Sequence, residues 1–133
     1  MIKAYRSYWR NGFNFEGRTS RDGYWWVVLV NVIVTIALIV YMYLSTSGAI
    51  DGFVNPLAFM GPVAPIAFVV SWPVITAVPT LAMTVRRLHD TGRSGLYYLF
   101  SLIPLAGFLI MVYFLISPTK DPRNNRYGYR RQV

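Results

Sequence analysis

The 133-residue sequence has no cysteine, one histidine and five acidic residues. Without cysteine there can be no disulfide, no thiolate nucleophile and no cysteine-ligated metal. Charge is also missing from two long stretches. Between residues 24 and 85 the only Asp, Glu, Lys, Arg or His is Asp51, and between residues 95 and 118 there is none. A chain this short cannot bury such stretches on all sides, so an ordinary soluble fold is excluded.

Apolar residues make up 55% of the chain and charged residues 14%, whereas about a quarter of an ordinary soluble domain is charged. We therefore predict a single all-α integral membrane domain over residues 1–133. The net charge of +8 lies in the segments that flank the apolar runs, where anionic lipid head groups are the nearest partners. No nucleic-acid-binding module is recognisable, so we expect no nucleic-acid partner.

Three apolar runs predict transmembrane helices over about 25–44, 66–85 and 96–116. Twenty helical residues, at ~1.5 Å each, cross a hydrocarbon core of ~30 Å. The remaining parts are an interfacial leader over 1–23 and a basic tail over 117–133. The proline- and glycine-rich stretch between the first two runs is expected to be a loop, with a short surface helix near residues 53–60.

The leader has the periodicity of an amphipathic helix. At about 100° per residue, one face gathers Ile2, Tyr5, Trp9 and Phe13 and an adjacent face gathers Lys3, Arg6 and Arg10. This pattern is typical of a helix lying in the membrane interface, with rings inward and basic groups at the phosphates. The alternative is an irregular leader whose aromatic side chains pack on the helical bundle.

Polar residues within the runs indicate caps and packing faces. Thr19 or Ser20 is expected to cap the first helix. Pro73 and Pro79 are expected to kink the second, because each removes a backbone donor. Threonines recur every four residues on that helix, at Thr76, Thr80 and Thr84. They either pack against other helices and repair the proline breaks, or line a polar cavity.

The most polar connector is the segment 86–95, which holds the only histidine. Arg86 and Arg87 end the second helix, where cations suit the helix dipole. The sequence Asp90-Thr91-Gly92 predicts a tight turn, and Ser94 is expected to cap the third helix.

Arginines from this connector and from the leader are expected to gather at one membrane surface. Arg18, Arg21, Arg86, Arg87 and Arg93, with His89 and Asp90, form the candidate site. Arginine is suited to lipid phosphates or to acidic groups of a protein partner because its guanidinium binds them in a bidentate manner. Asp90 could orient one arginine and hold His89 in one tautomer. The alternative is ordinary positive-inside anchoring with an intramolecular Arg–Asp pair.

The function that these features favour is a membrane scaffold or binding protein, acting on anionic lipids, a membrane-protein partner or a homo-oligomer. An oligomeric small channel or transporter is the alternative, with the threonine stripe along its path and His89 as a pH gate. An enzyme is not expected: His89 beside Asp90 lacks a nucleophile, and one histidine with scattered acids supplies no metal site. No cofactor is expected.

Several motifs together resemble one family. They are Gly17-Arg18 with Arg21 and Tyr24-Trp25, the segment RRLHDTGRSG over 86–95, Ile103-Pro104 with Gly107, and Asn125-Arg126-Tyr127-Gly128. In this order the chain resembles the YhaH-like family of small bacterial inner-membrane proteins, over residues 13–128. Gly23 stands where family members often carry glutamate. The resemblance implies a bacterial cytoplasmic-membrane protein and no particular activity.

Basic residues favour the cytoplasmic side of a membrane. The leader has five, the first loop none, the connector three and the tail five. We therefore predict a cytoplasmic N-terminus and three crossings, which leaves the five basic residues of the tail outside. A third stretch that turns back at residues 104–107 would place all thirteen inside, and this re-entrant topology is the alternative.

Overall fold

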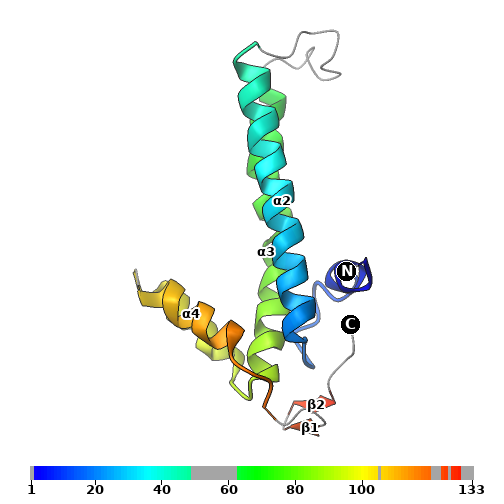
Figure 1. Ribbon diagram of the computed structural model, residues 1–133, viewed down its shortest axis with the longest axis vertical. Helices are drawn as coiled ribbons and strands as arrows, with labels where there is room; N and C mark the ends of the chain where they lie inside the picture. The colour runs from blue at the N-terminus through cyan, green and yellow to red at the C-terminus, as the bar shows by residue number, and fades with distance from the viewer. Residues whose placement is uncertain (1, 49–62, 105, 121–123, 126, 130–133) are drawn as a thin grey trace. The chain divides into compact units, whose positions relative to one another are not determined.

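The computed structural model describes the chain except for residues 1, 49–62, 105, 121–123, 126 and 130–133 (Figure 1). Its elements are α1 (Ile2–Arg10), α2 (Arg21–Thr46), α3 (Val63–Asp90), the 3-10 helix η2 (Gly95–Leu102), α4 (Ala106–Ile116), β1 (Asn124–Asn125) and β2 (Gly128–Tyr129). The two strands form a two-residue antiparallel pair. All other regular structure in the described residues is helical, which confirms the all-α class.

The chain divides into two compact units. One comprises Met1–Val28 with Val78–Val133, and the other comprises Leu29–Ala77. Helices α2 and α3 contribute to both. The core of the first unit draws buried side chains from α1, α2, α3 and α4: Ala4, Tyr8, Tyr24, Val27, Met83, Leu88, Met111 and Leu115. Every residue of the candidate site lies in this unit. The single membrane domain stays a prediction.

Helices α2 and α3 contain the first two predicted spans and extend beyond them. Both are long and apolar enough to cross a membrane. The hydroxyl of Ser20 accepts a hydrogen bond from the Gly23 amide at 3.0 Å, which confirms the predicted cap. Helix α3 runs through Pro73 and Pro79 without interruption. The Thr76 hydroxyl donates to the carbonyl oxygen of Trp72 at 2.8 Å, so it is used within the helix.

The unit formed by residues 29–77 exposes apolar side chains along both of its helical segments. Ile33 and Ile36 of α2 and Val70 and Val74 of α3 are all more than half exposed. A soluble protein would bury such side chains, whereas lipid is a favourable solvent for them. The surface helix expected near residues 53–60 lies outside the described residues.

Helix α3 ends in a Schellman motif. Gly92 has a positive φ of 76°. The Gly92 amide donates to the carbonyl of His89 at 3.0 Å, and the Arg93 amide donates to that of Leu88 at 2.9 Å. These are the two hydrogen bonds that define this helix ending, and the left-handed residue suits glycine. The predicted tight turn is confirmed.

The third apolar stretch, predicted as one crossing over 96–116, is divided into two helices. These are η2, which ends before Pro104 in the sequence, and α4, which begins after it; α4 is labelled in Figure 1. A Cβ on Gly107 would meet the carbonyl oxygen of Phe100 and would lie 3.0 Å from that of Ser101. The physical reason for the break is therefore the proline, which cannot continue a helix, together with a glycine that lets the two backbones approach closely.

Both ends of this stretch lie beside the last turns of α3. Gly95 lies so near Val85 that an added Cβ would be 2.8 Å from its Cγ1. At the other end, the carbonyl of Leu115 accepts a hydrogen bond from Arg87. Between them, Tyr97 of η2 and Phe114 of α4 pack edge to face, with ring centroids 5.6 Å apart. The stretch therefore folds back on itself as a hairpin.

Candidate functional site

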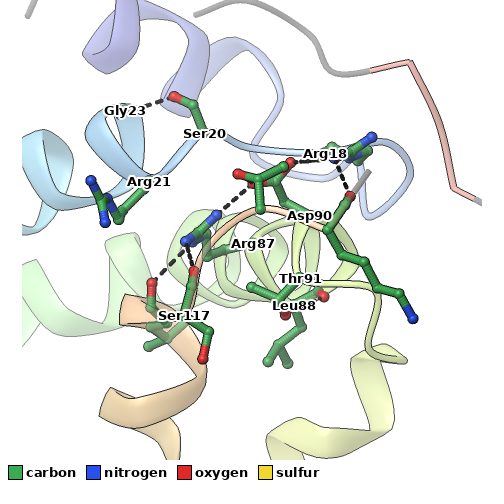
Figure 2. A network of polar contacts seen from close by, with 12 residues as sticks. Arg18, Ser20, Arg21, Gly23, Arg87, Leu88, Asp90, Thr91 and Ser117 are labelled. Carbon is green, nitrogen blue, oxygen red and sulfur yellow. Dashed lines mark hydrogen bonds and ion pairs between the residues drawn. The ribbon is translucent and has the colours of Figure 1, made fainter. Parts of the chain in front are cut away.

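The candidate site is centred on Asp90, the last residue of α3. Its Oδ1 accepts from Nε of Arg18 at 3.0 Å and lies 2.9 Å from Nη2 of the same side chain. Its Oδ2 accepts from Nη1 of Arg87 at 2.5 Å and from the Thr119 hydroxyl at 2.7 Å. Figure 2 shows Asp90 between the two arginines. All three charged side chains are fully buried, and we call Arg18, Asp90 and Arg87 the arginine–aspartate clamp.

Arg18 reaches the clamp from the loop between α1 and α2. The preceding Gly17 has a φ of 86°, a turn conformation that favours glycine. On the other side, the Thr19 amide donates to the carbonyl of Arg86 at 3.2 Å, which holds the loop against the end of α3. Nη2 of Arg18 also donates to the carbonyl of Lys120 at 3.0 Å. The loop before α2 is thereby joined to the segment after α4.

Arg87 joins α3 to the C-terminus of α4. Its Nε donates to the carbonyl of Leu115 at 3.0 Å and its Nη2 to that of Ser117 at 2.6 Å. These carbonyls belong to the last turn of α4 and the residue after it, where helices leave acceptors without an intrahelical donor. One planar guanidinium therefore serves a carboxylate and two carbonyls, which a lysine could not do in this geometry.

The clamp holds two positive charges and one negative charge in a buried place. A net charge there would be costly unless other groups balance it. Two helix C-termini meet at the clamp, since Asp90 ends α3 and Arg87 binds the carbonyls at the end of α4. Each helix C-terminus carries roughly half a negative charge. The second arginine is therefore balanced by the ends of α3 and α4.

The other predicted site residues lie around the clamp with different surroundings. Arg86 is buried, and its carbonyl binds the Thr19 amide. His89 stacks on Tyr127 with ring centroids 4.0 Å apart. The guanidinium of Arg93 lies 4.2 Å from the centroid of the Phe114 ring, a cation–π contact that holds it against α4.

Among the seven predicted site residues, only Arg21 has a largely exposed side chain, 56% accessible and 4.0 Å from Asp22. The structure brings Arg18, Arg87 and Asp90 together as expected, but inside the protein. Their donors and acceptors are directed at one another and at backbone carbonyls. Binding of lipid head groups by Arg18 or Arg87 would require this clamp to open.

Sequence reasoning did not find the partners that complete the clamp. Thr119 and the carbonyls of Leu115, Ser117 and Lys120 come from the segment at and after the end of α4. Every residue has a backbone carbonyl, so the sequence does not show which carbonyls accept these hydrogen bonds. The one available signal was Asp90 itself, an acid among arginines in a chain with few acids.

A second polar surface lies on α1. Ala4 and Tyr8 are buried, and the Tyr8 hydroxyl lies 2.9 Å from that of Thr80 on α3. The basic side chains of α1, Lys3, Arg6 and Arg10, are exposed. So are several apolar ones: Ile2 at 86%, Trp9 at 40% and, just beyond the helix, Phe13 at 82%.

Viewed along its axis, α1 therefore has three successive faces at about 100° per residue. The first, with Ala4 and Tyr8, packs on the protein. The second carries the exposed apolar and aromatic side chains, and the third carries the basic ones.

The threonines of α3 take part in packing. The Thr84 hydroxyl donates to the carbonyl of Thr80 at 2.8 Å and lies 3.4 Å from the Tyr24 hydroxyl of α2. With Tyr8 on Thr80 and Thr76 on its own helix, all three hydroxyls have partners within the protein. These contacts favour the packing role over the cavity lining.

Two long apolar helices, a folded-back apolar hairpin and a charged clamp at the end of α3 define a small helical membrane protein. The family model "Protein of unknown function (DUF805)" matches residues 12–129. The chain belongs to this family.

Two relatives from Escherichia coli (strain K12) are similar over most of their length. The inner membrane protein YhaI is 32% identical over 127 residues, which cover 96% of this chain and 93% of the relative. The inner membrane protein YhaH is 32% identical over 119 residues, which cover 90% and 88%. The resemblance seen in the sequence motifs is thereby confirmed. No solved structure matches the chain.

Proposed function

We propose that the chain is a multi-pass protein of the bacterial inner membrane with two crossings, α2 and α3, and with both flanking segments cytoplasmic. The observation that carries this topology is the return of the third apolar stretch to the end of α3 where it began. One crossing would separate its ends by ~30 Å. Residues 95 and 115 instead lie beside residues 85 and 87 of α3.

The distribution of charge supports the same arrangement. With two crossings, all thirteen Lys and Arg residues lie on one side, and the loop between the spans carries none. Basic residues near the ends of spans favour the cytoplasm, so this side is cytoplasmic. The relatives YhaI and YhaH are inner membrane proteins by name, which supports the location.

The topology is tested with single cysteines, which the cysteine-free chain makes unambiguous. Glu16→Cys, Ser47→Cys and Lys120→Cys change exposed residues. In intact cells, a membrane-impermeant maleimide is expected to label Ser47→Cys alone, and permeabilised cells should label all three. Labelling of Lys120→Cys in intact cells would instead establish three crossings.

At the cytoplasmic side we propose a membrane scaffold that binds anionic lipid head groups through α1. The three faces of α1 suit a helix in the interface: one packs on α3, one enters the lipid, and the basic one meets the phosphates. Lys3, Arg6 and Arg10 are exposed, whereas Arg18 and Arg87 are engaged inside the protein. The lipid-binding surface is therefore on the leader.

This binding is tested by mass spectrometry of the full chain released from nanodiscs of mixed phosphatidylglycerol and phosphatidylcholine. The wild type is expected to retain phosphatidylglycerol preferentially. A Lys3→Gln, Arg6→Gln, Arg10→Gln variant should lose this preference, while Lys3→Arg, Arg6→Lys, Arg10→Lys keeps the charge and should retain it. Equal preference in the neutral and charged variants would refute lipid binding by α1.

A further inference from the structure

The helices of the first unit gather beside the last part of α3. Helix α1 and the hairpin of η2 and α4 both lie beside the last part of α3, through Tyr8 on Thr80 and through Leu115 on Arg87. The unit of residues 29–77 has only the two segments of α2 and α3 in its described part. Among the described residues, every helix other than α2 and α3 belongs to the first unit.

The hairpin has the surface of a segment immersed in lipid. Leu96, Leu102, Phe108, Leu109 and Tyr113 are each about two thirds exposed or more. Between residues 95 and 118 there is no Lys, Arg, Asp, Glu or His. The hairpin follows α3, a helix long and apolar enough to cross a membrane, after the short connector of residues 91–94.

The depth of the hairpin follows from the length of its two arms. Helix α4 has eleven residues and η2 has eight, so each is ~16 Å long at ~1.5 and ~2.0 Å per residue. That is about half of a ~30 Å hydrocarbon core. An arm of this length reaches at most about half way across the hydrocarbon core. The turn at Pro104 therefore lies within one leaflet or near the bilayer midplane.

We propose that α1 and the η2–α4 hairpin form a wedge in the cytoplasmic leaflet, and that the protein therefore prefers membranes that are convex on the cytoplasmic side. The occupant of the exposed apolar faces is the acyl region of this leaflet. Helices α2 and α3 displace lipid from both leaflets, whereas α1, η2 and α4 displace it from one. Added cross-sectional area in one leaflet favours curvature that makes this leaflet the convex one. Binding of amphipathic helices is sensitive to curvature for this reason.

The proposal rests on the two-crossing topology proposed above. The basic side chains of α1 add a second reason for the choice of leaflet. Lys3, Arg6 and Arg10 are exposed beside the apolar face of the same helix, so charge complementarity draws this helix to an anionic surface. If a protein partner covered these apolar faces instead of lipid, enrichment of the protein on a curved membrane would not depend on which side its α1 end faces.

The experiment uses the full chain with one fluorophore on Glu16→Cys, reconstituted into giant vesicles of phosphatidylethanolamine and phosphatidylglycerol. An impermeant quencher separates molecules that have this end outside from those that have it inside. A narrow tube is pulled from each vesicle, and protein density on the tube is divided by density on the vesicle. The ratio is expected above one for outward-facing molecules and below one for inward-facing molecules.

Matched variants separate the wedge from the spans. Phe108→Ala with Leu109→Ala removes exposed volume from α4, and Ile33→Ala with Ile36→Ala removes exposed volume from α2. The first pair should bring both ratios toward one, and the second should leave them as in the wild type. All four substitutions to alanine retain helix propensity, and each variant is checked for a monodisperse profile in detergent.

Equal ratios in the two orientations would overturn the wedge. The topology proposal fails separately, through maleimide labelling of Lys120→Cys in intact cells. If the tube-to-vesicle ratios are equal in the two orientations and Lys120→Cys is not labelled in intact cells, the wedge alone is refuted. Labelled Lys120→Cys refutes the two-crossing arrangement, and the wedge with it.

Discussion

Neutralising Asp90 is expected to be the most damaging single change in the clamp. Asp90→Asn conserves shape but leaves only the ends of α3 and α4 to balance two buried arginines, so one positive charge has no counter-charge. An asparagine offers one acceptor oxygen, so its amide group must face one of the two guanidinium groups, donor against donor. The carboxylate now accepts from both arginines and from Thr119. Breaking a buried ion pair from one side costs about 3–5 kcal/mol, and we expect that loss here.

Charge counting predicts an order among the clamp variants. Arg18→Met leaves the Arg87–Asp90 pair neutral, so it should cost less than Asp90→Asn. The double variant restores the formal net charge of the wild type, so its cost should fall short of the sum by about 1–3 kcal/mol. The control is Arg21→Met, three residues from Arg18 with an exposed side chain, where about 0–1 kcal/mol is expected.

The assay is the free energy of unfolding in mixed detergent micelles, followed by circular dichroism. Protease sensitivity of the loop before α2 reports local opening of the same contacts. If Asp90→Asn were as stable as Arg21→Met, to within about 0.5 kcal/mol, the clamp would not be a stabilising element. Strict additivity of Arg18→Met and Asp90→Asn would refute the charge argument while leaving the hydrogen bonds.

Two further predictions concern glycines. Gly107→Ala should destabilise the hairpin by about 1–3 kcal/mol, because the new Cβ meets backbone carbonyls that cannot move aside, whereas Ala106→Ser at an exposed neighbour should be neutral in the same unfolding assay. Gly92→Ala should lower the free energy of unfolding by about 1–2 kcal/mol, because Gly92 has a φ of 76°. Gly92→Asn should lower it less, because asparagine tolerates this conformation. Equal losses would show that the contact of the added Cβ with Lys120, at 2.7 Å, dominates.

The helices that sequence reasoning placed well are those with long local signals. The apolar runs within α2 and α3, the Ser20 and Ser94 caps and the turn before Gly92 depend on residues near one another in the chain. The third stretch was harder, because a continuous apolar run is equally consistent with one crossing or two short arms. Pro104 was visible, but the close approach of Gly107 to Phe100 depends on the folded hairpin.

The sequence predicts which residues form the candidate site, but it does not predict whether their side chains are buried or exposed. Asp90 and Arg18 are 72 residues apart, and nothing local distinguishes a buried arginine from one at a head group. The sequence leaves an intramolecular Arg–Asp pair open as an alternative, but it does not predict a second arginine on the same carboxylate. What decides the matter is the approach of the segment after α4, whose carbonyls accept from both arginines.

The clamp also explains why the buried arginines and the exposed basic residues of the first unit have different roles. An acid at the end of α3 opposes the helix dipole, so Asp90 requires cations to be tolerated there. Arg87 meets that need and satisfies the end of α4 at the same time, while Arg18 draws in the loop before α2. These donors hold the first unit together and are not directed at phosphates. In the lipid binding proposed above, contact with the membrane surface is made by Lys3, Arg6 and Arg10, which are exposed on a helix that the contact of Tyr8 with Thr80 holds beside α3.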